Sequence, residues 1–125
     1  MKHLTATLEG ADLRRAVAMA IGLRVYKEDN RCWVCDDRFG LPTPFSAYGF
    51  APDLKGDQAV PIIEDAHMAT GYCHDSAYWP GQWYAQLDDD ANPHNNHHQI
   101  GPTLLVAAMR CRVSMAFGRE VDLPA

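Results

Sequence analysis

The longest helical pattern of hydrophobic residues lies over Gly101 to Pro124. Thr103 suits the start of this helix because its hydroxyl can accept a first-turn amide, and Gly118 suits the end because glycine adopts a left-handed conformation at little cost. The pattern therefore predicts a helix from about Thr103 to Phe117. Apolar side chains occupy most of its girth, and its small or polar sector contains Ala107, Arg110 and Ser114. A helix of this kind packs on two sides, which predicts a sheet and a second helix beside it.

A second helix is predicted over Glu9 to Ile21. Its apolar residues recur at positions i, i+3, i+4, i+7 and i+8, and Gly22 follows as a stop. Arg14 and Arg15 lie off this apolar stripe, so we expect them on a solvated face rather than in an anion site.

The rest of the chain contains short β-type patterns. Leu23 to Lys27 and Arg31 to Cys35 predict a hairpin, Trp83 to Leu87 alternates as a half-buried strand does, and Glu120 to Leu123 predicts an edge strand. Prolines and glycines between Asp36 and Val60 exclude a long helix or strand there. The tripeptide Pro61-Ile62-Ile63 is interpreted as a short strand with proline at its first position.

These elements predict an α+β fold, in which a small, mostly antiparallel sheet packs with an N-terminal and a long C-terminal helix in an α-β-α sandwich-like arrangement. Residues 88–99 form a polar surface loop in this interpretation. The core is expected to contain ten residues: Leu13, Val17, Ile21, Ile62, Trp83, Leu105, Ala108, Met109, Cys111 and Val113.

Bulk properties narrow the function classes. A length of 125 residues suits a single domain over 1–125, and a formal charge of -5 disfavours nucleic acid as a partner. The chain has no apolar run long enough for a membrane span and no signal-peptide pattern, so we expect a cytoplasmic protein without a membrane partner. Its four cysteines are then expected to be reduced thiols.

Several segments together resemble a known family. They are Leu8 to Leu13, Pro61-Ile62-Ile63-Glu64 with Gln58 before it, Trp83-Tyr84-Ala85, and the C-terminal run TLLVAAMRCRVSMAFGREVDLP. In order and spacing they are similar to the NinX-like proteins of phages and prophages, against which residues 88–99 look like an insertion. The resemblance implies a small phage-encoded accessory protein of unknown function, with no catalytic residues to carry over.

Cysteine and histidine residues provide candidates for a metal site. Cys32 and Cys35 have the two-residue gap of a zinc knuckle, but a second close-spaced pair is missing. The remaining candidate ligands are Cys73, His74, His94, His97 and His98. We favour the absence of a metal site and expect no cofactor, while a small Cys/His metal-binding protein stays the alternative hypothesis.

Two further groups suggest catalysis or charge pairing. Cys73-His74-Asp75-Ser76 contains the residue types of a hydrolase, the third hypothesis, but neighbours in sequence generally point apart and no oxyanion-hole motif accompanies them. Arg112 lies between the apolar stripes of the C-terminal helix, where we expect it to snorkel or to pair with a carboxylate such as Glu64. We assign no catalytic residue.

An aromatic cluster is the candidate binding surface. Four aromatic rings fall between Tyr78 and Tyr84, next to a proline-rich connection with further rings. Strand alternation directs Trp83 inward, whereas Pro80-Gly81 should turn the chain at a rim. The outward partner surface is expected to contain Phe45, Tyr48, Tyr78, Trp79 and Tyr84. The alternative is that these rings only cover the open face of the sheet. The sequence thus favours a non-catalytic protein-binding module that binds a host or phage protein, and self-association is a second option.

Overall fold

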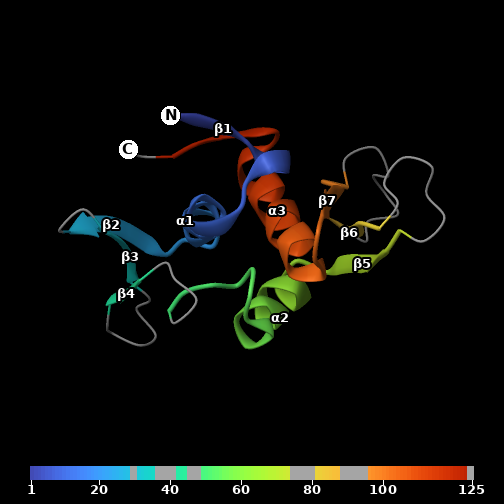
Figure 1. The fold of residues 1–125 in the computed structure, drawn as a ribbon, viewed down its shortest axis with the longest axis horizontal. Coiled ribbons are helices and arrows are strands. Elements are labelled where there is room, and N and C mark those ends of the chain that lie inside the picture. Colours follow the sequence, from blue (N-terminus) through green and yellow to red (C-terminus); the bar gives the residue numbers. More distant parts are fainter. Residues whose placement is uncertain (29–30, 36–41, 45–48, 74–80, 88–95, 124–125) are drawn as a thin grey trace.

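The computed structural model describes residues 1–28, 31–35, 42–44, 49–73, 81–87 and 96–123, with the backbone alone for 24, 26–28, 31–35 and 42–44. The helix α3, Leu104–Phe117, lies at the centre (Figure 1). On one side of it is α1, Gly10–Ala20, and on the other side are the strands β5, Met68–Tyr72, β6, Trp83–Leu87, and β7, Gln99–Gly101. Thr103 Oγ1 accepts the amide of Val106 at 3.1 Å. Gly118 has the predicted positive φ of 79°, but its ψ of -143° lies outside the αL region. Both predicted ends of the helix are confirmed.

The N-terminal helix and the first hairpin are also confirmed. Helix α1 spans Gly10–Ala20, and Gly22 follows it with a φ of 83°. Strand β2, Arg24–Glu28, pairs antiparallel with β3, Arg31–Cys35, and β3 pairs with the short β4, Pro42–Pro44. This three-stranded sheet contacts α1 through β2 and β3.

The predicted strand over Pro61-Ile62-Ile63 is wrong. These residues belong to a helix, α2, which spans Gly56–Asp65 with Pro61 inside it. The inner side of α2 has Ala59 fully buried, with Ile62 and Ile63 packed against the same core. Burial of this side offsets the helix-breaking tendency of proline, because tertiary packing contributes more to helix stability than local propensity does.

A second three-stranded sheet packs against α3. Strand β5, Met68–Tyr72, pairs antiparallel with β6, Trp83–Leu87, and β6 pairs with β7, Gln99–Gly101. The strand predicted at Trp83 to Leu87 is confirmed. The expected loop over 88–99 is too long at its C-terminal end, since Gln99 begins β7; residues 88–95 lie outside the described residues.

The two ends of the chain form a two-stranded sheet. Strand β1, Lys2–Leu4, pairs with β8, Glu120–Asp122, which confirms the predicted C-terminal edge strand. A single 3-10 turn, η1, Thr5–Thr7, follows β1, and Thr5 Oγ1 donates to the Gly118 carbonyl at 2.7 Å. The described strands thus divide among three antiparallel sheets, and the α+β class is confirmed. No helix in the described part of the chain is long and apolar enough to cross a membrane.

Helices α1 and α3 share one core, as predicted. Six of the ten expected core residues are fully buried: Leu13, Val17, Ala108, Met109, Cys111 and Val113. Ile62, Trp83 and Leu105 are partly buried against them, whereas Ile21 is half-buried outside this cluster. The predicted small or polar sector of α3 is buried too: Ala107 is 0% exposed, Ser114 6% and Arg110 8%. The exposed end of α3 is at Ala116 and Phe117 instead.

Candidate partner-binding surface

Tyr84 occupies the outer face of the β5-β6-β7 sheet. In β6, Ala85 is fully buried, and Trp83 and Leu87 pack against the core beside α3. Side chains alternate along a strand, so Tyr84 and Gln86 lie on the face turned away from α3. This is the orientation predicted for Tyr84.

The Tyr84 ring lies directly over Gly71. Gly71 is the partner of Tyr84 across the β5-β6 ladder, and a Cβ atom added to Gly71 would lie 2.6 Å from Tyr84 Cε1. Carbon atoms in contact normally stay about 3.5–4.0 Å apart. Because Gly71 has no side chain, it leaves the space that the Tyr84 ring occupies.

His98 covers the Tyr84 ring from another side. The two rings are nearly parallel, with centroids 6.0 Å apart and an interplanar angle of 16°. Asn96 holds this arrangement: its Oδ1 accepts the His98 amide at 3.2 Å, and its Nδ2 donates to Gln86 Oε1 at 3.2 Å. Burial lowers the pKa of His98 below its ordinary value, so the imidazole is neutral at pH 7.

The outer face as a whole carries no formal charge at pH 7 in its described part. Its residues follow from the register of the three strands and are all half-buried: Ala69, Gly71, Tyr84, Gln86, His98 and Ile100. We call these six residues the outer sheet face. A tyrosine, an imidazole and an amide on an otherwise apolar surface give it hydrogen-bonding groups without charge.

The other predicted members of the binding surface are not placed. Phe45, Tyr48, Tyr78 and Trp79 lie outside the described residues. The predicted turn beside them has partial support, because Gly81 has a φ of 77° and its amide donates to the Cys73 carbonyl at 3.4 Å. On the inner face, Trp83 makes an edge contact with Tyr72, whose ring centroid is 5.1 Å away at an interplanar angle of 60°.

The described candidate metal ligands do not converge. Cys73 lies beside Gln82, because its amide donates to the Gln82 carbonyl, whereas the register of β7 places His98 beside Gln86. The two candidate ligands are therefore separated by four residues along the same stretch of chain. Four residues along a strand span about 13 Å, and zinc ligands must lie within about 2.0–2.3 Å of the metal. No group of three described His, Cys, Asp or Glu residues could hold a metal ion.

The other candidate metal ligands form no cluster among the described residues. Cys32 and Cys35 lie three residues apart in the unbroken ladder of β3, where the backbone alone is described. His74 and His94 lie outside the described residues. His97 is described, and its Nδ1 lies 3.0 Å from Ser114 Oγ on α3. That contact secures the chain before β7 to the central helix.

Two nucleophilic side chains of α3, those of Cys111 and Ser114, are buried, whereas Cys73 is half-buried. Burial raises the pKa of Cys111 to about 12, so its thiol stays protonated and unreactive at pH 7. The pair of His97 and Ser114 has the residue types of a catalytic dyad, but Ser114 is only 6% exposed within α3. Of the predicted hydrolase group, Cys73 alone is described, and residues 74–76 lie outside the described residues.

A family model for NinX of bacteriophage P22 matches residues 4–116, which is most of the chain. The chain belongs to the phage P22 NinX family. The match includes α1, α2, the outer sheet face and nearly all of α3. None of the curated proteins compared with the chain matches it.

Arginines stabilise this NinX family member in ways that the sequence did not indicate. Arg14, expected on a solvated face, has a side chain 13% exposed and pairs with the buried Asp53, with Nε 2.7 Å from Oδ1 and Nη2 3.1 Å from Oδ2. Arg15, also expected to be solvated, is 14% exposed and pairs with Asp12 at 2.7 Å. Both expectations were wrong because the carboxylate partners and the segment around Asp53 cover this side of α1.

Arginines of α3 bind backbone carbonyl groups. Arg110 donates from Nε to the Leu8 carbonyl and from Nη1 to the Ile100 carbonyl, each at 2.9 Å. Arg112 donates from Nη2 to the Ala20 carbonyl at the C-terminal end of α1, at 3.0 Å, so the expected pairing with Glu64 is wrong. A cation suits that helix end, where the last carbonyl groups carry partial negative charge. Arg110 thereby joins η1 and β7 to α3 and fixes the sheet that carries Tyr84.

Proposed function

We propose that this phage protein is a non-catalytic protein-binding module, whose partner is a host or phage protein that contacts the outer sheet face. The observation that carries the proposal is the ordered, uncharged stack of Gly71, Tyr84 and His98 on the side of the sheet turned away from α3. Tyrosine is enriched at protein interfaces because it buries a large area, keeps a polar group and loses little conformational entropy.

Preorganisation supports the same proposal. Tyr84 lies against the Gly71 backbone and the His98 imidazole before any partner arrives, and Asn96 accepts the backbone amide of His98. A side chain that is already ordered loses less entropy on binding, which leaves more of the contact energy as affinity. A charged surface would lose more through desolvation, and the described part of this face has no charge to desolvate.

The test is affinity capture from infected or lysogenic cells with tagged protein. Wild-type protein should retain a partner in stoichiometric amount, while Tyr84→Arg and Gln86→Arg should lose it, because each places a charge on the uncharged face. Glu120→Lys, an exposed substitution on β8, is the control and should retain the partner. Gln86→Arg is the second variant because Gln86 does not lie over Gly71, and the melting temperature of each variant checks folding.

Retention of the partner by both folded arginine variants would refute this site. Stoichiometric zinc in untagged protein, lost on Cys32→Ser, would instead favour the alternative of a small metal-binding protein.

A further inference from the structure

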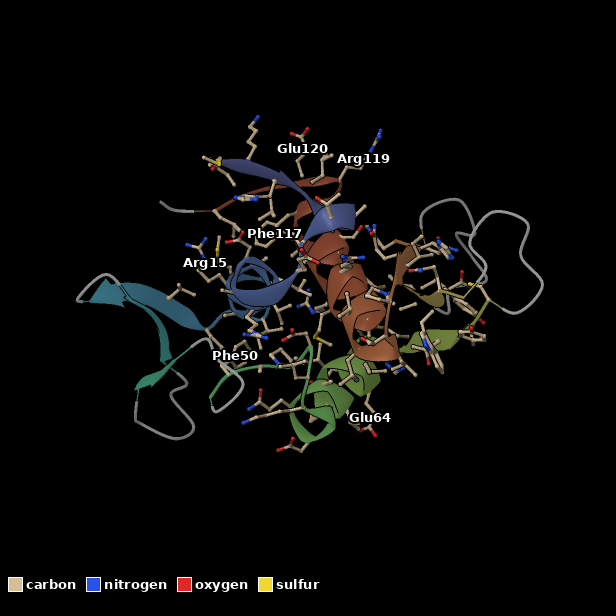
Figure 2. The ribbon with its side chains drawn as sticks, in the orientation of Figure 1. Arg15, Phe50, Glu64, Phe117, Arg119 and Glu120 are labelled. Atoms are coloured by element: carbon tan, nitrogen blue, oxygen red, sulfur yellow. The ribbon has the colours of Figure 1, made fainter. Side chains whose placement is uncertain are left out.

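Helix α2 has an outward face that the fold does not use. Its inner side is occupied by Ala59, Ile62 and Ile63 in the core. The opposite side exposes four residues spaced at i, i+3, i+4 and i+7: Asp57, Val60, Pro61 and Glu64. Figure 2 shows Glu64 on the side of α2 turned away from α3.

Apolar side chains are exposed on and next to this face. Val60 is 47% exposed, and Leu54, in the turn that leads into α2, is 57% exposed. They are two of the six large apolar residues exposed in the described part of the chain. Both residues are close in sequence to exposed acidic residues, and exposed apolar side chains with a polar border are typical of protein interaction sites.

Pro61 gives an independent reason to assign a role to this face. Proline is the least favourable residue inside a helix, because it lacks the amide that would donate to the carbonyl four residues earlier, here that of Asp57. Pro61 is exposed, so its ring contributes little to the core. A local rule broken at an exposed position, without a gain in packing, is expected at functional sites.

The charges on the face indicate the kind of partner. Asp57, Glu64 and Asp65 are all exposed, and none of the three forms an ion pair with a described residue. A second copy of this face would bring like charges together, and the excess of acidic residues over the whole chain acts against nucleic acid in the same way. Lysine and arginine side chains on a partner would complement it.

We propose that the outward face of α2 docks a basic amphipathic segment of a partner protein. Leu54, Val60 and Pro61 contact apolar side chains of that segment, and the carboxylates at its border attract its lysines or arginines. Amphipathic helices bind apolar surfaces through residues at this spacing. This surface belongs to a different element from the outer sheet face, so it goes beyond the proposed function and would let one small protein contact two partners.

The experiment titrates isotope-labelled protein with a synthetic amphipathic helical peptide of leucine, alanine and lysine, followed by NMR. Chemical-shift changes should map to Leu54 through Asp65, and added salt should weaken binding. Val60→Ser and Glu64→Lys should each raise Kd about tenfold, a usual effect for a central interface residue. The matched controls are Leu4→Ser, at an exposed apolar residue, and Glu120→Lys, at an exposed acidic residue; both should leave Kd unchanged. Figure 2 shows Glu120 at the end of the molecule far from Glu64, and Leu4 is the partner of Glu120 in the β1-β8 pair.

Pro61→Ala adds a readout that a purely structural role would not give. It should raise the melting temperature, because alanine restores the missing helical amide, and it should weaken peptide binding. A melting temperature that rises while Kd stays unchanged would overturn the role of Pro61.

The proposal as a whole is refuted if a peptide with glutamate in place of every lysine binds equally well, or if the controls weaken binding as much as the α2 variants. Shift changes confined to β5, β6 and β7 would also refute it, while leaving the outer sheet face as a binding site. Loss of the cellular partner on Tyr84→Arg with intact peptide binding would separate the two surfaces.

Discussion

Substitution of Gly71 by alanine tests the packing beneath the candidate surface. The φ of Gly71 is not in the left-handed region, so its backbone accepts alanine, and the whole cost comes from the contact with Tyr84. The added Cβ would lie 2.6 Å from Tyr84 Cε1. The ring must therefore move by about 1 Å to restore normal contact.

The magnitude follows from two opposing effects. Adding a methyl group to a packed site costs about 1–3 kcal/mol, and replacing glycine by alanine restricts the unfolded chain and contributes about 0.4–1 kcal/mol of stability. Gly71→Ala should therefore lower the free energy of unfolding by up to about 2.6 kcal/mol. In a Tyr84→Ala background the obstructing ring is absent, and the same substitution should stabilise the protein by about 0.4–1 kcal/mol.

Urea denaturation of the wild type, both single variants and the double variant gives the coupling energy between the two positions. We expect a coupling of about 1–3 kcal/mol. An equal effect of Gly71→Ala in both backgrounds would show that the ring does not lie over Gly71 and would remove the preorganisation argument.

Four further predictions concern stability. Arg110→Met should lower the free energy of unfolding by roughly 2–4 kcal/mol, since two hydrogen bonds from a cation to carbonyl groups are lost while the desolvation cost of the cation is recovered. The control Arg119→Met, at an exposed site, should change the melting temperature little. Equal effects of the two substitutions would contradict this role of Arg110. Met109→Ala should cost about 2–5 kcal/mol in chemical denaturation, and a cost below about 0.5 kcal/mol would mean that Met109 is not in the core. Because the pKa of His98 is lowered in the folded protein, the unfolded state binds a proton at a higher pH, so the free energy of unfolding should fall as the pH drops below 6.5. His98→Gln should weaken this pH dependence of stability, and an unchanged dependence would show that His98 is not its cause. Trp83→Ala should strongly destabilise the protein, whereas Trp79→Ala should leave the melting temperature nearly unchanged and abolish partner capture. If the two variants melt at the same temperature, Trp79 is a core residue and not part of the binding surface.

Local signals in the sequence were sufficient for the two long helices and for β6. Thr103 and Gly118 limit α3 through groups within a few residues of them, and the alternation around Ala85 requires only one buried face. The same local reasoning failed at Pro61. The missing amide of proline is tolerated at the first position of a strand and is unfavourable inside a helix, so local signals favour the strand. Packing of Ile62 and Ile63 on the core decides between them, and that packing is not local.

The partners of buried polar groups could not be predicted, because they lie far away in sequence. Arg14 pairs with Asp53 across 39 positions, and Arg110 binds the Leu8 carbonyl across 102. A helical projection shows which residues of α3 share a side but not which side other elements cover. The projection therefore places Arg110 and Ser114 in one polar sector but does not indicate that both are buried.

The candidate surface was predictable in part. The outward position of Tyr84 follows from strand alternation alone. Its neighbours Gly71 and His98 depend on the registers of β5 and β7 against β6, which a sequence without turn signals of fixed length does not specify. Residues 74–80 lie between β5 and β6 in the sequence, and residues 88–95 lie between β6 and β7. Connections of this length do not fix which residues of the strands pair.

Photo-cross-linking from position 84 in infected or lysogenic cells tests the central claim most directly. Tyr84 is replaced by benzoylphenylalanine, and the same replacement at Leu4, an exposed position on β1, is the control. The account predicts one discrete adduct of this protein with a host or phage protein at position 84 and none at position 4. A folded protein that forms no adduct from position 84, or forms the same adduct from both positions, would contradict it.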